Sequence, residues 1–92
     1  NLASFYQLKL KNTKFTNCNL QETDFVEADI SNSMLDNCDL KRAVFENSNL
    51  EKADFRTSYN YSINPETNNI KKAKFSLNGI AGLLEKYQIL IE

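Results

Sequence analysis

Large apolar side chains recur along this chain with a period of five residues. The series runs without a gap and reads Phe5, Leu10, Phe15, Leu20, Phe25, Ile30, Leu35, Leu40, Phe45, Leu50 and Phe55. An α-helix turns about 100° per residue and a straight strand alternates its faces, so neither would gather these side chains on one side. The chain must instead turn once per pentad, so that every large side chain points at a common axis.

Four sides at roughly right angles would close a coil of 20 residues, and successive coils would stack at the strand spacing of about 4.8 Å. A three-sided coil of 15 residues is the competing geometry, but it would stack Phe over Leu throughout the series. With 20 residues per coil like residues stack, and Phe25 is expected to lie between Phe5 and Phe45 in one column. The pattern therefore favours an all-β solenoid of square, parallel coils.

The other positions of each pentad agree with this geometry. The residue two before the large one is small in ten of eleven cases, with Leu8 as the exception: Ala3, Leu8, Thr13, Cys18, Thr23, Ala28, Ser33, Cys38, Ala43, Ser48 and Ala53. A narrow tube has room for one large side chain per edge, so the second inward position must be small. The residue just before the large one is often Asn or Asp, which favours turns: Asn19, Asp24, Asp29, Asp39, Asn49 and Asp54. The two residues after it are polar and variable, as expected of an outer face.

These pentads resemble those of the pentapeptide-repeat proteins over residues 3–57. The matching units include Cys18–Glu22, Ala28–Asn32 and Ala53–Thr57. The resemblance implies a right-handed quadrilateral parallel β-helix, here of about three to four 20-residue coils, and its handedness comes from the resemblance alone. It also implies a non-enzymatic scaffold or protein–protein interaction module. The alternative that it implies is a DNA-mimicking protein that protects a topoisomerase, gyrase, and confers quinolone resistance.

The repeat falters after Phe55 and then returns. Residues 62–69 read as an irregular loop, while Ile70 and Phe75 resume the phase and should join the eleven earlier residues in the core. Since Phe75 is 20 residues beyond Phe55, we expect one more coil. We therefore divide the chain into a β-helix at 1–75 and a C-terminal capping helix and tail at 76–92.

The C-terminal segment has the apolar spacing of an α-helix. Ser76 is suited to cap the start of this helix, and two glycines weaken the expectation somewhat. The helix should lie across the open end of the tube. An apolar run follows that one helical stripe does not bury, so a homodimer through residues 77–92 is a further expectation. The residues expected in the cap or dimer interface are Ile80, Leu83, Leu84, Tyr87, Ile89, Leu90 and Ile91.

The charge balance gives no field that would attract nucleic acid or a membrane. The net charge is −1, and residues 1–56 carry nine acidic and seven basic side chains. A 20-residue coil would place Glu22 beside Arg42 and Asp36 beside Arg56, which would neutralise an anionic stripe. A DNA mimic needs a long negative surface, so this chain as given is a poor one. The basic residues Lys71, Lys72 and Lys74 form a patch near the expected cap.

No constellation of residues points to catalysis. The chain has no His and only two Gly, so neither a general-base site nor a phosphate-binding loop is expected. Cys18 and Cys38 fall in the small inward slot, one coil apart, and are expected as buried free thiols rather than a disulfide. We expect no enzyme activity, no cofactor and no metal. An unidentified protein partner, with gyrase as one candidate, is the expected ligand.

Two further expectations concern the chain as a whole. No signal peptide or transmembrane span is seen, so the sequence predicts a cytoplasmic protein. The chain starts at Asn1 inside a repeat, which fits a fragment whose first coils are missing.

Overall fold

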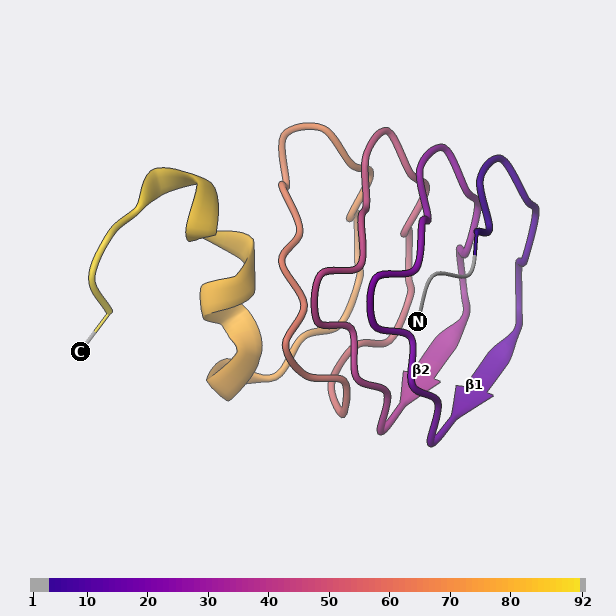
Figure 1. Cartoon of the computed structure of the whole chain (residues 1–92), viewed down its shortest axis with the longest axis horizontal. Coiled ribbons are helices and arrows are strands. Elements are labelled where there is room, and N and C mark those ends of the chain that lie inside the picture. Colours follow the sequence, from indigo (N-terminus) through magenta and orange to yellow (C-terminus); the bar gives the residue numbers. More distant parts are fainter. Residues whose placement is uncertain (1–3, 92) are drawn as a thin grey trace.

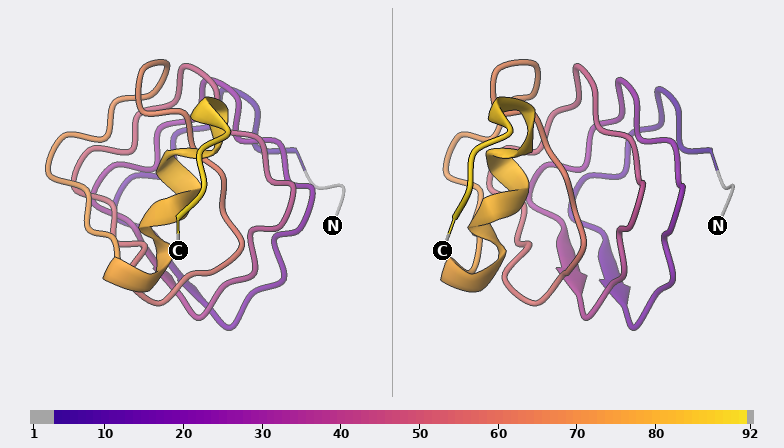
Figure 2. Two further views of the ribbon diagram at one scale, coloured as in Figure 1. Left: turned by 90° about the vertical axis from the view of Figure 1, so that its left-hand side faces the viewer. Right: turned by 60° about the vertical axis from the view of Figure 1, so that its left-hand side comes forward.

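The computed structural model describes residues 4–91 and shows a β-solenoid whose coils stack along one axis (Figures 1 and 2). Parallel bridges join residues 20 positions apart, such as Lys9 to Asp29 and Asp29 to Asn49. Two short strands, β1 (Lys14–Thr16) and β2 (Met34–Asp36), pair in the same register. The predicted 20-residue coil is therefore present, and a 15-residue coil is excluded.

The corners of the coils are made by residues with a left-handed backbone. Every fifth residue from Gln7 to Lys52 has a positive φ, between 52° and 62°. This conformation is costly for most residues and least so for Asn, which occupies half of these positions: Asn12, Asn17, Asn32, Asn37 and Asn47. The repeat pattern had indicated only a variable outer face at this position. It is instead the residue that turns the chain.

The Asn or Asp before each large residue supports the same corner. Asp24 Oδ1 accepts a hydrogen bond of 2.8 Å from the backbone N–H of Val26, and Asp29 Oδ1 accepts one of 3.0 Å from Ser31. The same contact two residues along the chain occurs at Asn19, Asp39, Asn49, Asp54 and Asn69. The predicted turn role of these side chains is confirmed.

The large apolar side chains fill the tube in columns. Phe25 is fully buried, and its ring lies between Phe5 at 5.4 Å and Phe45 at 4.8 Å. The Phe25 and Phe45 rings are parallel, whereas Phe5 meets Phe25 edge to face. The remaining expected core residues that are buried are Leu20, Ile30, Leu35, Leu40, Leu50 and Phe55.

The ends of the tube are less covered than its middle. At the first coil Phe5, Leu10 and Phe15 are only partly buried against the core, and Leu8 is exposed. Ala3 lies outside the described residues. At the other end the partly buried core residues are Ile70 and Phe75.

The small inward slot carries hydrogen bonds between coils. The hydroxyl of each serine in this slot donates to a carbonyl oxygen 23 residues earlier: Ser33 to Leu10, Ser48 to Phe25 and Ser58 to Leu35, at 2.8, 2.7 and 2.5 Å. Cys38 Sγ makes the equivalent contact with the Phe15 carbonyl at 3.6 Å. Both cysteines are free thiols, but only Cys38 is buried, which raises its pKa; the expectation of a buried thiol is wrong for Cys18, which is half-buried. The slot therefore takes a small side chain that is able to donate, as well as Ala.

The irregular loop keeps the register of the coil. Asn68 occupies the small slot that serine fills in other coils. Like those serines it donates to a carbonyl 23 residues earlier, from its Nδ2 to Phe45 at 3.1 Å. Asn69 then bridges to Asn49, and Phe75 stacks on Phe55 with centroids 5.3 Å apart. The expected return of the repeat after the loop is confirmed.

The C-terminal segment forms two short 3-10 helices rather than the expected α-helix. They are η1 (Leu77–Leu83) and η2 (Glu85–Tyr87). A Cβ on Gly79 would lie 2.3 Å from the Tyr61 hydroxyl, and one on Gly82 would lie 2.3 Å from the Tyr61 carbonyl oxygen. Residues three apart share a face of a 3-10 helix, so this double contact with Tyr61 favours the tighter turn.

The predicted start of this segment is confirmed. Ser76 Oγ accepts a hydrogen bond of 3.1 Å from the backbone N–H of Gly79, as an N-cap does. Figure 2 shows the segment lying across one end of the coils. Within residues 4–91 no helix has the length and apolar character needed to cross a membrane.

Candidate functional site

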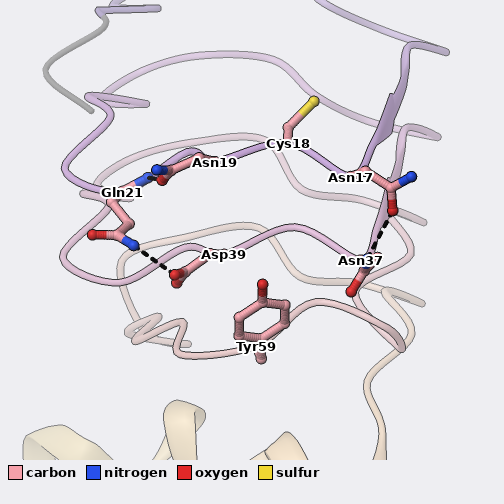
Figure 3. Close-up of a pocket in the computed structure, with 7 residues that line it drawn as sticks. All are labelled: Asn17, Cys18, Asn19, Gln21, Asn37, Asp39 and Tyr59. Atoms are coloured by element: carbon pink, nitrogen blue, oxygen red, sulfur yellow. Dashed lines mark hydrogen bonds between the residues drawn. The ribbon is translucent and has the colours of Figure 1, made fainter.

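One side of the solenoid carries a polar pocket of about 240 Å³ (Figure 3). It is formed where equivalent side chains of successive coils stack into ladders. Its lining residues are Asn17, Cys18, Asn19, Gln21, Asn37, Asp39 and Tyr59. Asn17 and Asn37 are corner residues, and Asn19 and Asp39 support corners, so the backbone of the coil fixes where these side chains point.

Hydrogen bonds between side chains hold this pocket in one arrangement. Asn37 Nδ2 donates to Asn17 Oδ1 at 2.7 Å, so these two side chains form a ladder across neighbouring coils. Gln21 Nε2 donates to Asp39 Oδ2 at 2.6 Å, and Asn60 Nδ2 donates to Asp39 Oδ1 at 3.1 Å. Burial alone would raise the pKa of Asp39, but the hydrogen bonds that it accepts lower it. Asp39 is therefore a carboxylate whose orientation is set before any ligand arrives.

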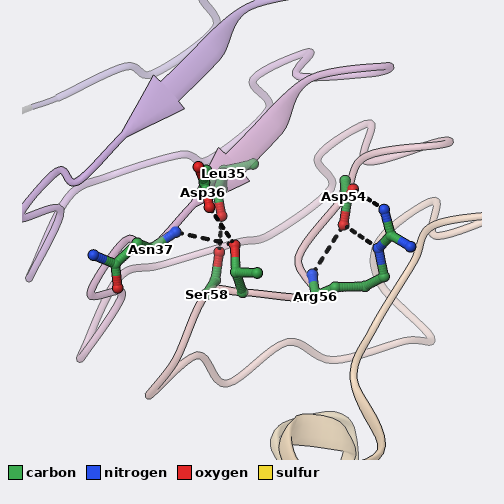
Figure 4. A network of polar contacts seen from close by, with 7 residues as sticks. Leu35, Asp36, Asn37, Asp54, Arg56 and Ser58 are labelled. Carbon is green, nitrogen blue, oxygen red and sulfur yellow. Dashed lines mark hydrogen bonds and ion pairs between the residues drawn. The ribbon is translucent and has the colours of Figure 1, made fainter.

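A second polar network lies around the next corner of the coil (Figure 4). Arg56 Nε and Nη2 contact the Asp54 carboxylate at 3.0 and 2.9 Å. Asp36 accepts instead from the Thr57 hydroxyl, at 2.9 Å. The prediction of an Asp36–Arg56 pair is therefore wrong. Asp54 lies two residues before Arg56 in the same coil and binds its guanidinium instead.

The other charge pair expected across coils is present. Arg42 Nη1 lies 3.4 Å from Glu22 Oε2, with both side chains largely exposed. An exposed pair of this kind contributes only about 0–1 kcal/mol to stability. Its main consequence is to cancel charge on that side of the solenoid.

A second pocket, of about 340 Å³, separates the last coil from η1 and η2. Its lining residues are Ser58, Tyr59, Asn60, Tyr61, Asn78, Gly79, Ala81, Gly82 and Glu85. The Tyr61 hydroxyl is buried beside Ser76 without forming a well-aligned hydrogen bond, and burial raises the pKa of Tyr61. Tyr61 is thus the side chain on which the C-terminal segment rests.

Sequence reasoning missed Tyr61 and its neighbour Ile63, which are both buried. The pentad phase assigns the large inward positions here to residues 60 and 65, which are Asn and Pro. The signal that was available is the pair of apolar residues two apart, just before Pro65. In the structure they fill the end of the core that Asn60 and Pro65 leave open, and Tyr61 contacts the rings of Phe55 and Phe75.

The residues expected in the cap or dimer interface are not gathered into one buried stripe. Leu83 packs against the core and Leu84 is half-buried, while Ile80 and Tyr87 are about half exposed. The residue that η1 buries is Gly82. The apolar residues left exposed on this segment are Leu77 at 86%, Ile89 at 54%, Leu90 at 86% and Ile91 at 58%.

One contact set fixes η2 to the irregular loop. The Glu66 carboxylate accepts from Lys86 Nζ at 2.6 Å and from the Tyr87 hydroxyl at 2.8 Å. These two hydrogen bonds lower the pKa of Glu66, and the same carboxylate raises the pKa of Lys86 and of Tyr87. In residues 4–91 no three His, Cys, Asp or Glu side chains cluster as metal ligands would.

The repeat geometry agrees with a comparison against protein families. A family model described as a pentapeptide repeat region matches residues 2–83. The chain belongs to the pentapeptide-repeat family. A search of the curated proteins found no match to this pentapeptide-repeat protein.

Among solved structures, one that reaches a TM-score of 0.50 shares its fold. A trypsin-treated variant of QnrB1, described as a plasmid-mediated fluoroquinolone resistance protein, is 18% identical with a TM-score of 0.50. All of this chain aligns with 44% of that one. A second QnrB1 variant is 15% identical with a TM-score of 0.49, and 97% of this chain aligns with 45% of it.

A third structure is Rfr23, a pentapeptide-repeat protein from the cyanobacterium Cyanothece 51142. It is 13% identical with a TM-score of 0.40, and 83% of this chain aligns with 89% of it. This chain spans less than half the length of the QnrB1 chains. At 18% identity, the similarity to the first QnrB1 variant is one of fold.

Proposed function

We propose that this pentapeptide-repeat protein is a non-enzymatic scaffold that binds a protein partner through the ladder side lined by Asn17, Asn37, Asp39 and Tyr59. The proposal includes a right-handed quadrilateral β-helix of about three to four coils, with η1 and η2 as its cap. The observation that carries it is the set of polar side chains that already hold one another, beside a tyrosine that is 45% exposed. Side chains ordered before binding lose little entropy on binding, and tyrosine is enriched at interfaces.

A charge insertion at the ladder side tests this proposal. The comparison uses proximity capture followed by mass spectrometry on wild type, Tyr59→Asp and Tyr6→Asp. Tyr6 is the matched control, because it is equally exposed and lies outside the pocket. We expect partner proteins that Tyr59→Asp loses and Tyr6→Asp retains. Identical capture by all three proteins would contradict the proposal.

A second candidate function is protection of a DNA topoisomerase from quinolones by mimicry of DNA. One observation favours it: the coil sides away from Lys9–Lys14 and Lys71–Lys74 carry six acidic residues, of which Glu22, Glu27, Glu46 and Glu66 are exposed and Asp24 and Asp39 are half-buried. The Glu22–Arg42 pair weakens that surface. A gyrase supercoiling assay with a quinolone tests the candidate, and neither protection nor inhibition at micromolar protein would remove it.

Self-association through residues 77–92 is the third part of the proposal. Its support is the exposed apolar run at Ile89, Leu90 and Ile91, on a segment whose other face rests on the last coil. Light scattering at high protein concentration should give about twice the chain mass of 10.6 kDa. Leu90→Lys should restore the monomer mass, and a monomeric wild type would refute the dimer.

A further inference from the structure

The coil register separates the charges of this nearly neutral chain onto two opposite edges. We call two adjacent sides of each coil the basic edge; they comprise residues 9–16, 29–36, 49–56 and 69–76. It carries eight cationic and four anionic side chains, a net charge of +4. The opposite edge, residues 4–8, 17–28, 37–48 and 57–68, carries two cationic and six anionic side chains, a net charge of −4.

The lysines of the basic edge are free to reach a ligand, whereas Arg56 is paired with Asp54 and the acids are engaged. All eight cationic side chains are exposed: Lys9, Lys11, Lys14, Lys52, Arg56, Lys71, Lys72 and Lys74. The four acids are half-buried and engaged. Asp54 is held by Arg56, Asp36 accepts from Thr57, and Asp29 accepts from the backbone of Ser31. The outermost charge on this edge is therefore positive.

The lysines form two clusters at the two ends of the basic edge. We call Lys9, Lys11 and Lys14 the first-coil cluster, and Lys71, Lys72 and Lys74 the last-coil cluster. Unbroken bridge columns connect them, because Lys9, Asp29, Asn49 and Asn69 follow one another at successive coils. Three coil steps of about 4.8 Å place the clusters roughly 14 Å apart. The strip between them carries the four acids together with Lys52 and Arg56.

We propose that the basic edge docks on duplex nucleic acid, with one lysine cluster on each phosphate backbone and the strip between them facing the major groove. The major groove is about 12 Å wide, which the long lysine side chains at a spacing of about 14 Å match. Lysine side chains bind phosphates as point charges and give affinity without reading sequence. The net charge of −4 on the far edge orients the molecule toward a polyanion.

Other polyanions fit this edge less well. A single strand is bound through exposed aromatic side chains, and the exposed tyrosines lie away from the basic edge, Tyr6 and Tyr59 on the opposite edge and Tyr87 in η2. A flat anionic membrane would meet the acidic strip as well as the lysines, whereas a groove leaves space between two rows of phosphates. The expectation that nucleic acid is not bound rested on the net charge of the whole chain. Folding divides that charge between two edges.

Fluorescence anisotropy of a labelled 24-base-pair duplex tests the proposal, with the whole chain at 20 to 200 mM salt. We expect a Kd of about 10⁻⁵ M at the lowest salt, and a slope of log K against log salt of about −5 for six phosphates. The charge reversals K9E/K11E/K14E and K71E/K72E/K74E should each weaken binding at least about tenfold. The matched control K41E/R42E, on the opposite edge, should bind within about threefold of wild type.

Thermal melting of each variant checks folding, and Lys→Gln changes at the same positions replace any reversal that does not fold. Parallel arms use the single strand, phosphatidylserine vesicles and polyglutamate. No binding to the duplex at 100 µM protein and 20 mM salt would overturn the proposal. So would equal or tighter binding to any other arm, or a control that loses as much as the cluster variants. If reversing the charge of one lysine cluster leaves the affinity for the duplex unchanged, the arrangement with one cluster on each phosphate backbone is wrong.

Discussion

The regular coils and the C-terminal segment cover apolar surface in different ways. In the coils each pentad contributes one buried ring or leucine, one small side chain and one left-handed corner, so every coil covers the next. The C-terminal segment has no repeat to extend. It rests on Tyr61 through two glycines and on Glu66 through Lys86 and Tyr87. The comparison suggests that stability is concentrated in the coils and that exposed apolar surface is concentrated at this end.

Removing a ring from a coil should have the largest effect. Phe25→Ala would leave a cavity between two rings and should cost about 3–5 kcal/mol of unfolding free energy. Urea denaturation measures it, with Leu90→Ala as the control from the C-terminal segment, where we expect less than about 0.5 kcal/mol. A loss below about 1 kcal/mol for Phe25→Ala would mean that the columns do not support the coil as described.

A methyl group at the cap should separate the two regions. Gly82→Ala would force the new Cβ against the backbone of Tyr61, so η1 must move away at a cost of about 1–3 kcal/mol. Hydrogen exchange should show lost protection at Ile63, whose N–H donates to the Gly82 carbonyl, and unchanged protection at Phe25. Ala81→Gly is the control, since residue 81 is exposed. Lost protection throughout the coils would show that the two regions are one cooperative unit.

A smaller change should weaken the contact between two coils. Ser48→Ala removes the 2.7 Å hydrogen bond to the buried Phe25 carbonyl and should cost about 1 kcal/mol. Ser62→Ala is the control, because Ser62 is exposed. Thermal melting compares the two variants. Equal melting temperatures would contradict this cost. They would show that the slot requires only a small side chain, such as the alanines at equivalent positions, and not a hydrogen-bond donor.

Acid should loosen the C-terminal segment through Glu66. Its pKa is lowered in the folded state, so its contribution is present above about pH 4.5 and is lost as the pH falls through that lowered value. NMR shifts of the Tyr87 ring should report this release. Glu66→Gln should abolish the step, and its persistence in that variant would assign it to another carboxyl, such as Asp29, Asp39 or Asp54, whose pKa values are also lowered.

The sequence predicted the coils in detail because each pentad repeats the same local arrangement of inward and turn residues. The column through Phe25, the turn role of Asp24 and the Asn17–Asn37 ladder all follow from position in the repeat. The corner role of Asn12 was missed, because a variable polar residue looks the same whether it turns the chain or simply faces solvent. The Asp54–Arg56 pair was missed because the coil register places both Asp36 and Asp54 near Arg56 and does not show which carboxylate is nearer to its guanidinium.

The C-terminal segment was harder to predict because its structure depends on one tertiary partner. The apolar spacing from Ile80 to Tyr87 is typical of an α-helix. Tyr61 overrides that preference by contacting Gly79 and Gly82, three residues apart. The segregation of charge was equally hidden from composition, because a net charge near zero arises from two edges of opposite sign only after the coil is closed.

The coil register is the claim on which the ladders, the edges and the buried columns all depend, and NMR measures it directly. In the folded protein, nuclear Overhauser contacts should connect the backbones of residues 20 apart, such as Lys9 with Asp29 and Asn19 with Asp39. The Phe25 ring should also contact the Phe45 ring. Contacts between the backbones of residues 15 apart, in place of those 20 apart, would contradict the square coil and every surface assigned from it.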